Sequence, residues 1–261
     1  MADAPDDDRR RGEWAALAAP WINEMRQGRN ANRVGLLDDV VMSCCCELAG
    51  RRVIDSGCGE GRWCRIAANA GASEVLGLDL CDAMIQAAVA VKGPREAYRV
   101  ADVRAIPFVN DATFDIAVSY LNQCDLDDFV ANTREVFRVL KPGGRLVVAN
   151  LHPMRSAVGT WHRDESGAKR HVVVDDYFDE GARTWRMLGV EFTNYHRSLQ
   201  TYLDAYLEAG FHLRRIAEPT VSAENLEQYP ELDDELRVPN FIVFALDEPY
   251  GPIQRTPCRG S

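Results

Sequence analysis

Two kinds of residue in this chain are best suited to bind a ligand. They are glycines at alternate positions and acidic residues at the ends of two apolar runs. Gly57, Gly59 and Gly61 follow a short apolar run that ends at Asp55. A helical stretch comes next, and a second apolar run ends at Asp79. Glycines let a ligand approach the backbone closely, and a terminal acid can accept hydrogen bonds from both hydroxyls of a ribose. The order strand, glycine turn, helix, strand, acid predicts half of a nucleotide-binding βαβ unit.

The glycine spacing separates two classes of nucleotide-binding protein. A dinucleotide fingerprint has its third glycine three residues after the second. That place is Arg62 here, and the third glycine is Gly61. The pattern D-x-G-x-G-x-G resembles the first motif of the class I S-adenosylmethionine methyltransferases, whose cofactor carries a cation and no phosphate. A nicotinamide oxidoreductase is the alternative, and the spacing opposes it.

Further motifs follow at the distances that this resemblance requires. Asp102, Pro107 and Phe108 match the pattern D-x-x-x-x-P-F after a third predicted strand. A K-P-G-G turn at 141–144 leads into an apolar fifth strand at 145–151. With these motifs, the chain resembles the small-molecule class I methyltransferases of the UbiE-like type. Nucleic-acid amino-methyltransferases usually have an Asn, Asp or Ser followed by two prolines and an aromatic residue after the fourth strand. This chain has Ser-Tyr-Leu-Asn at 119–122 and no proline pair.

The resemblance implies the fold and the cofactor. The fold is α/β, with a Rossmann-like seven-stranded methyltransferase sheet whose last strands, 211–217 and 241–246, form an antiparallel hairpin. The cofactor is S-adenosylmethionine, with Asp55 near its amino group, Gly57 and Gly59 facing its methionine part, and Asp102 as the acceptor for the adenine amine. The residues expected to bind it are Asp55, Gly57, Cys58, Gly59, Gly61, Asp79, Leu80, Asp102, Val103 and Tyr120.

Composition excludes several classes of partner. A formal net charge of −10 in 261 residues argues against binding to nucleic-acid phosphates. No apolar run is long enough to span a bilayer, and the N-terminus has no signal-peptide pattern. Eight cysteines without a C-x-x-C pair indicate reduced thiols. We therefore expect a cytoplasmic protein without a catalytic metal; the oligomeric state is not predicted.

The residues after the fifth strand are too numerous for a simple connector. Short β-like runs with turn signals at 166–167 and 180–181 predict an antiparallel insert, expected to fold over the strand ends and close over the cofactor. Before the first strand, tryptophans at helical spacing with Pro20 between them predict one broken helix or two short ones. The predicted organisation is a disordered leader at 1–12, N-terminal helices and cofactor-binding core at 13–151, a β-rich insert at 152–197, the rest of the core at 198–247, and a disordered tail at 248–261.

Methyl transfer from a sulfonium is an in-line displacement, and a hydroxyl or ammonium acceptor must also lose a proton. His152 directly follows the fifth strand and His196 lies where the insert rejoins the core, so either could be the base. The alternative for both is a hydrogen-bonding role that fixes the ends of the insert. The predicted catalytic residues are His196, His152 and Tyr120, and the predicted substrate residues are Trp21, Arg33, Asn122 and Tyr195.

The predicted function is methyl transfer from S-adenosylmethionine to an O or N nucleophile of a small molecule, with secondary metabolites among the candidates. The identity of the acceptor is not predicted. Another alternative is a protein that binds S-adenosylmethionine without catalysis or for a reaction other than methylation. Tyr120, Asn122 and Asp125, which follow the fourth predicted strand, are placed to contact the sulfonium or the acceptor.

Overall fold

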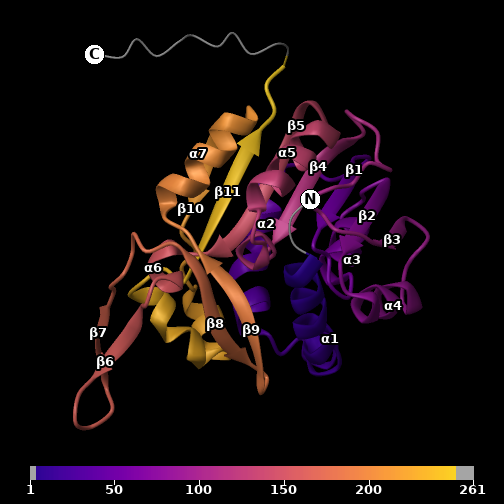
Figure 1. Ribbon diagram of the computed structural model, residues 1–261. Helices are drawn as coiled ribbons and strands as arrows, with labels where there is room; N and C mark the ends of the chain where they lie inside the picture. Colours follow the sequence, from indigo (N-terminus) through magenta and orange to yellow (C-terminus); the bar gives the residue numbers. More distant parts are fainter. Residues whose placement is uncertain (1–3, 251–261) are drawn as a thin grey trace, which may run out of the picture.

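A seven-stranded sheet forms the centre of the protein, in the strand order β10-β11-β5-β4-β1-β2-β3. The computed structural model describes residues 4–250 (Figure 1). β3, β2, β1, β4 and β5 run parallel, and β11 is antiparallel to both β5 and β10. The predicted fold class and terminal hairpin are confirmed. The strands are β1 Arg52–Ser56, β2 Glu74–Asp79, β3 Glu96–Val100, β4 Phe114–Tyr120, β5 Leu140–Leu151, β10 His212–Ala217 and β11 Phe241–Asp247.

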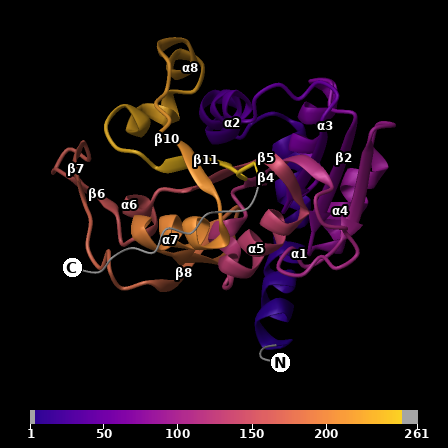
Figure 2. The same cartoon turned by 90° about the horizontal axis from the view of Figure 1, so that it is seen from above.

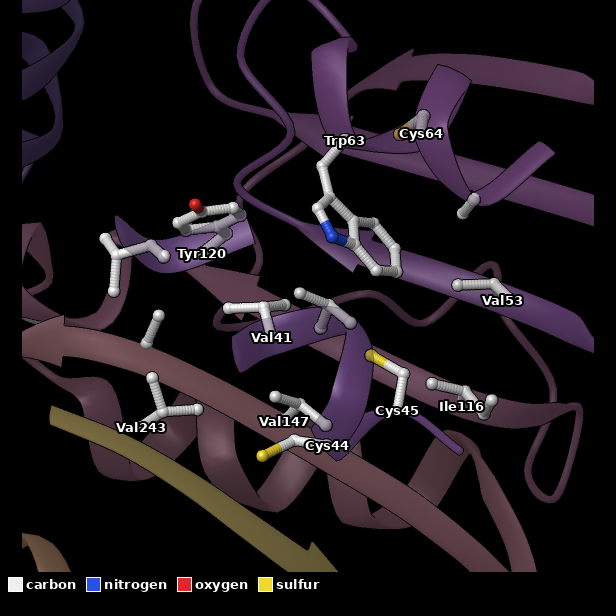
Figure 3. Packing of buried hydrophobic residues seen from close by; sticks show 14 of the residues in the cluster. Val41, Cys44, Cys45, Val53, Trp63, Cys64, Ile116, Tyr120, Val147 and Val243 are labelled. Carbon is white, nitrogen blue, oxygen red and sulfur yellow. The ribbon is translucent and has the colours of Figure 1, made fainter. Parts of the chain in front are cut away.

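Helices cover both faces of the sheet, and its central strands are therefore buried on both sides. α2 and α3 lie on one face, and α5 and α7 on the other (Figure 2). Figure 3 shows Val41, Cys44 and Cys45 packed against Val147 and Val243 of the sheet. The helices are α2 Asp38–Cys44, α3 Arg62–Asn69, α4 Asp82–Ala90, α5 Phe129–Val139 and α7 Leu199–Ala209.

The predicted β-rich insert after the fifth strand is present as two hairpins, each a separate two-stranded sheet. Register pairs Trp185 with Phe192 and Gly181 with His196 in the second hairpin. A short helix, α6 Pro153–Ser156, joins β5 to the first hairpin. The hairpin strands are β6 Thr160–Arg163, β7 Lys169–Val173, β8 Gly181–Met187 and β9 Val190–His196.

The N-terminal segment differs from the prediction. α1 is one helix, Ala4–Arg26, so the expectation of disorder is wrong for residues 4–12 and the helix does not break at Pro20. Leu17 and Trp21 are buried while Pro20 is exposed. Proline has no N–H to donate to the carbonyl four residues earlier, and that carbonyl lies on the solvent side of the helix. Packing on β9 and α4 stabilises α1 as one helix.

Two further segments complete the description. α8 Ala223–Gln228 and the 3₁₀-helix η3 Pro230–Leu236 were not predicted, and they pack beside the π-helical turn η1 Arg33–Leu37 and each other. Residues 251–261, most of the predicted disordered tail, lie outside the described residues, as do residues 1–3. Within 4–250, no helix combines the length and the apolar character that crossing a bilayer requires.

Candidate active site

The glycine loop between β1 and α3 has backbone angles that favour glycine. Gly57 has φ +86° and Gly59 has φ +54°. The amides of Gly57 and Cys58 both donate to the Leu78 carbonyl at 2.8 Å, which fixes the loop to the end of β2. A Cβ on Gly57 would lie 2.2 Å from Cγ of Asn122, whereas a Cβ on Gly59 would meet no described atom within 4 Å. Gly59 therefore faces open space at the carboxyl edge of the sheet.

That space is the first cavity, at the carboxyl ends of β1, β2 and β4. It holds about 90 Å³, less than the several hundred Å³ usual for a ligand cavity. All the residues predicted to bind the cofactor line it except Gly61. A Cβ on Gly61 would lie 2.5 Å from the Tyr98 hydroxyl, so this glycine lets the loop pack against β3. The cofactor roles themselves stay predictions.

Two carboxylates, the buried Asp55 and the half-buried Asp79, face this cavity with different degrees of hydrogen bonding. Asp55 is 1% exposed; its Oδ1 has no hydrogen-bond partner, and its Oδ2 lies 3.3 Å from Sγ of Cys64. Burial raises the pKa of Asp55 to about 7. Asp79 accepts from the amide of Gly59 at 2.8 Å and from that of Cys81 at 2.9 Å. Burial also raises the pKa of Asp79, although these amides oppose the shift.

The end of β3 contributes a third acid. Asp102 accepts from the side chain and the amide of Arg104, with the nearest oxygen 2.7 Å from a guanidinium nitrogen. Burial alone would raise the pKa of Asp102, but the hydrogen bonds and charge of Arg104 outweigh it and the pKa is lowered. Asp102 is therefore ionised where an amine donor would meet it.

Aromatic rings and an arginine form another wall of the first cavity. The Arg33 guanidinium lies 4.5 Å from the Tyr120 ring centre and 5.3 Å from that of Trp21, and its Nε is buried without a hydrogen-bond partner. The Tyr120 hydroxyl donates to Asp38 at 2.9 Å. Burial raises the pKa of Tyr120 well above its ordinary value, so it is a neutral wall residue at neutral pH and not a base.

α1 covers the first cavity, which corrects the expectation that the insert closes over it. Trp14, Trp21 and Met25 of α1 line this cavity, and no residue of β6–β9 does. The β8–β9 hairpin instead lies against α1. Arg9 donates to Thr193 and, at 3.0 Å, to the Tyr195 hydroxyl. Tyr195, predicted to contact substrate, is thus part of a clasp between α1 and β9 and lines none of the described cavities.

A second cavity of about 380 Å³ lies beyond the first, between the β8–β9 hairpin, the 3₁₀-helix η3 and the ends of β5 and β11. Trp185, Phe192 and Phe241 line it together with the buried Glu235. The residues that line both cavities are Trp14, Trp21, Arg33, Leu121 and Asp125. Of the predicted substrate residues, Trp21 and Arg33 lie at this junction, and Asn122 lines the first cavity only.

The predicted catalytic histidines line no described cavity. His196 is fully buried; its Nε2 lies 2.9 Å from the Tyr177 carbonyl and its Nδ1 2.8 Å from the Ser156 hydroxyl. Because a carbonyl only accepts, Nε2 carries the proton, and Nδ1 accepts from Ser156. Neither ring nitrogen is then free to take a proton from a methyl acceptor. The prediction of His196 as the base is wrong on this geometry, and the alternative role of fixing the insert is the one seen.

His152 has a similar position at the other end of the insert. Its Nδ1 accepts from the Met154 amide at 3.1 Å and caps α6, and its Nε2 lies 3.1 Å from Glu218. The catalytic prediction for His152 is therefore also wrong. Sequence reasoning left Leu121 out of the site. Leu121 has φ +56°, an unusual value for a leucine that no sequence pattern signals.

Comparison with known proteins agrees with this geometry. The model of the methyltransferase domain family matches residues 54–148. The structure of an S-adenosylmethionine-dependent methyltransferase from Mesorhizobium loti superposes with a TM-score of 0.73 and 32% identity, over 80% of this chain and 96% of that one.

Two curated relatives match more locally. The demethylmenaquinone methyltransferase of Lactococcus lactis is 33% identical over 41% of this chain and 45% of its own length. The malonyl-[acyl-carrier protein] O-methyltransferase of Erwinia billingiae is 34% identical over 39% of each protein. Since the Mesorhizobium protein is matched over nearly its whole length, this chain belongs to the S-adenosylmethionine-dependent methyltransferases, and S-adenosylmethionine is its cofactor.

Proposed function

We propose that this enzyme transfers the methyl group of S-adenosylmethionine to an oxygen or nitrogen nucleophile of a small molecule bound in the second cavity. The observation that carries the proposal is the shared wall of the two cavities, formed by Trp14, Trp21, Arg33, Leu121 and Asp125. An in-line displacement needs donor and nucleophile in contact along one axis. A donor in the first cavity and an acceptor in the second would meet at this wall.

The first cavity has the polar groups that the cofactor needs. The unpartnered Oδ1 of Asp55 would accept from the cofactor's ammonium, and each oxygen of Asp79 has a lone pair left for a ribose hydroxyl. Asp102 would accept from the adenine amine, and the open space at Gly59 would admit the methionine part. The bound cofactor supplies an electrophilic methyl group on a sulfonium; the protein's residues bind it, orient it and exclude water.

The second cavity supports a small organic acceptor. Its volume of about 380 Å³ falls within the range usual for small-molecule sites, and its aromatic lining suits a planar or partly apolar compound. The net charge of −10 gives no support to a nucleic-acid substrate. The two curated relatives have different printed acceptors, so their names leave the acceptor of this enzyme open. The free cysteines among the described residues favour a reducing compartment, such as the cytoplasm.

The test is release of S-adenosylhomocysteine with a panel of 4-methylcatechol, 4-hydroxybenzoate, phenethylamine and sodium iodide. Met187→Trp, on a residue that lines only the second cavity, should abolish transfer to the organic acceptors and leave S-adenosylhomocysteine binding unchanged. The control is Leu236→Trp, on a residue of the 3₁₀-helix η3 that is 57% exposed and outside both linings. Wild-type enzyme that binds the cofactor and methylates no member of the panel would count against the proposal.

A further inference from the structure

Asp125 is the only carboxylate, among the described residues, that lines both cavities. It ends the short 3₁₀-helix η2 Gln123–Asp125 that follows β4, and it is 8% exposed. Its Oδ1 accepts from the side-chain amide of Asn194 on β9, and the Cys124 thiol lies 3.5 Å from the same oxygen. Both contacts hold one oxygen, so the carboxylate is fixed in orientation at the place where the cavities meet.

The other acids that line the cavities are less well placed for chemistry on an acceptor. Asp55 and Asp79 line the first cavity only. Glu235 lines the second cavity only, and it accepts from the Asn240 side chain at 2.7 Å and from its amide at 3.3 Å. A base must reach both the nucleophile and the space in which the methyl group is transferred, and Asp125 is the acid that meets this requirement.

The charges around Asp125 come from several elements. Burial raises the pKa of Asp125 to about 7, and the nearby Asp79 adds to the shift. The Cys124 hydrogen bond and the positive charges of Arg10 on α1 and Arg33 on the π-helical turn η1 oppose it. A general base works best when its pKa lies near the operating pH, because it is then ionised and still basic enough to hold a proton.

We propose that Asp125 is the catalytic base of this enzyme, and that its acceptor is therefore a nucleophile with a proton to lose, namely a hydroxyl or an ammonium. This inference rests on the proposed function. An acceptor oxygen donates a lone pair to the methyl carbon, and the carbon–sulfur bond breaks with its electron pair going to sulfur, which gives S-adenosylhomocysteine. The proton of the hydroxyl passes to Asp125, which later releases it to water. An ammonium loses its proton to Asp125 before its nitrogen attacks.

The decisive experiment compares acceptors with and without a proton. Asp125→Asn should lower kcat for 4-methylcatechol or phenethylamine by about 10²- to 10⁴-fold. Transfer to iodide, which has no proton to lose, should stay at the wild-type rate, measured as methyl iodide in the headspace. Wild-type kcat for the protic acceptor should rise with pH through the region near 7, and the variant should lose this dependence.

A matched control separates this role from folding effects. Asp128→Asn changes an acid on the same loop that lines none of the described cavities and caps α5, and asparagine caps equally well, so all rates should stay at the wild-type level. If Asp125→Asn lowers transfer to iodide and to protic acceptors alike, or lowers neither, Asp125 is not the base. Wild-type enzyme that binds S-adenosylhomocysteine and methylates no acceptor would instead overturn the proposed function.

Discussion

The two cavities share a wall but are assembled in different ways. The first is built mainly from strand ends, with short segments at 55–63, 79–81, 101–103 and 120–122, and α1 and Arg33 add most of the rest. The second draws on 14–33, 121–125, 151–155, 185–194 and 231–241, which only the folded chain brings together. A cofactor site of this kind can therefore be predicted from local sequence motifs, whereas an acceptor site cannot. One family can keep its cofactor while its acceptors diverge, because the second cavity lies on segments outside the sheet motifs.

Two buried aspartates also differ between the two cavities in the role that each can have. Burial raises the pKa of both Asp55 and Asp125 to about 7. Asp55 faces the first cavity with an unpartnered oxygen, so it is suited to bind a cation. Asp125 faces both cavities with one oxygen held by Asn194, so it is suited to take a proton. The same shift in pKa thus supports binding in one place and chemistry in the other.

The largest effect on the cofactor side is expected from Gly59→Val. The residue has φ +54° and faces open cavity, so valine would strain the backbone and occupy cofactor space. We expect S-adenosylhomocysteine affinity to fall by about 3 kcal/mol or more, measured by calorimetry. Gly167→Val is the control, because Gly167 has φ +84° and open space around it in the β6–β7 turn, away from both cavities. Equal loss of binding in both variants would show that backbone strain causes the loss, and not the occupation of cofactor space by the valine side chain.

Asp79→Ala should have the next largest effect. Removing a charged acceptor of ribose hydrogen bonds costs about 1.5 to 3 kcal/mol of cofactor binding. The KM for the organic acceptor should change little, because Asp79 does not line the second cavity. Asp82→Ala, at the exposed start of α4, serves as the control in the same calorimetric titration. A folded Asp79→Ala enzyme with wild-type affinity would remove this residue from the cofactor site.

Cofactor affinity should depend on pH through Asp55. Its pKa of about 7 means that it must lose a proton before it can pair with the cofactor's ammonium. S-Adenosylhomocysteine should therefore bind about tenfold more tightly at pH 8 than at pH 6, and the affinity should fall as pH falls through 7. Asp55→Asn should bind weakly with little pH dependence, whereas Asp125→Asn should keep the wild-type dependence. The reverse result would exchange the roles of the two aspartates.

The smallest effect on catalysis is expected at the insert. His196→Ala leaves Ser156 and the Tyr177 carbonyl without their partner, so it should lower the free energy of unfolding by about 1 to 3 kcal/mol. The kcat of the folded variant and its pH profile should match those of the wild type. Urea unfolding and a pH–rate series on the same sample measure both quantities. A large loss of kcat with unchanged stability would restore His196 as a candidate base.

Local patterns predicted the sheet, the glycine loop and the terminal hairpin, because strand alternation, glycine spacing and helix stripes are local properties. They named Trp21, Arg33 and Asp125 of the junction, but not how these residues come together. Asp125 and its partner Asn194 are 69 positions apart, and their pairing depends on how the β8–β9 hairpin docks. His196 has the residue type of a base, but the residues around it bury it completely. Burial of this kind follows from tertiary packing. The continuous α1 likewise depends on packing against β9 and α4.

The clasp between α1 and β9 has a consequence for the kinetics of turnover. Arg9 and Glu13 bond to Thr193, and α1 carries Trp14 as a wall of both cavities. Because α1 covers the first cavity, whose volume is only about 90 Å³, we expect α1 to move when the cofactor enters or leaves, and this motion would also displace Trp14 from the acceptor's wall. We therefore expect compulsory-order kinetics in which S-adenosylmethionine binds first and S-adenosylhomocysteine leaves last. Product inhibition by S-adenosylhomocysteine would be competitive with the donor, and its slow release would limit steady-state turnover.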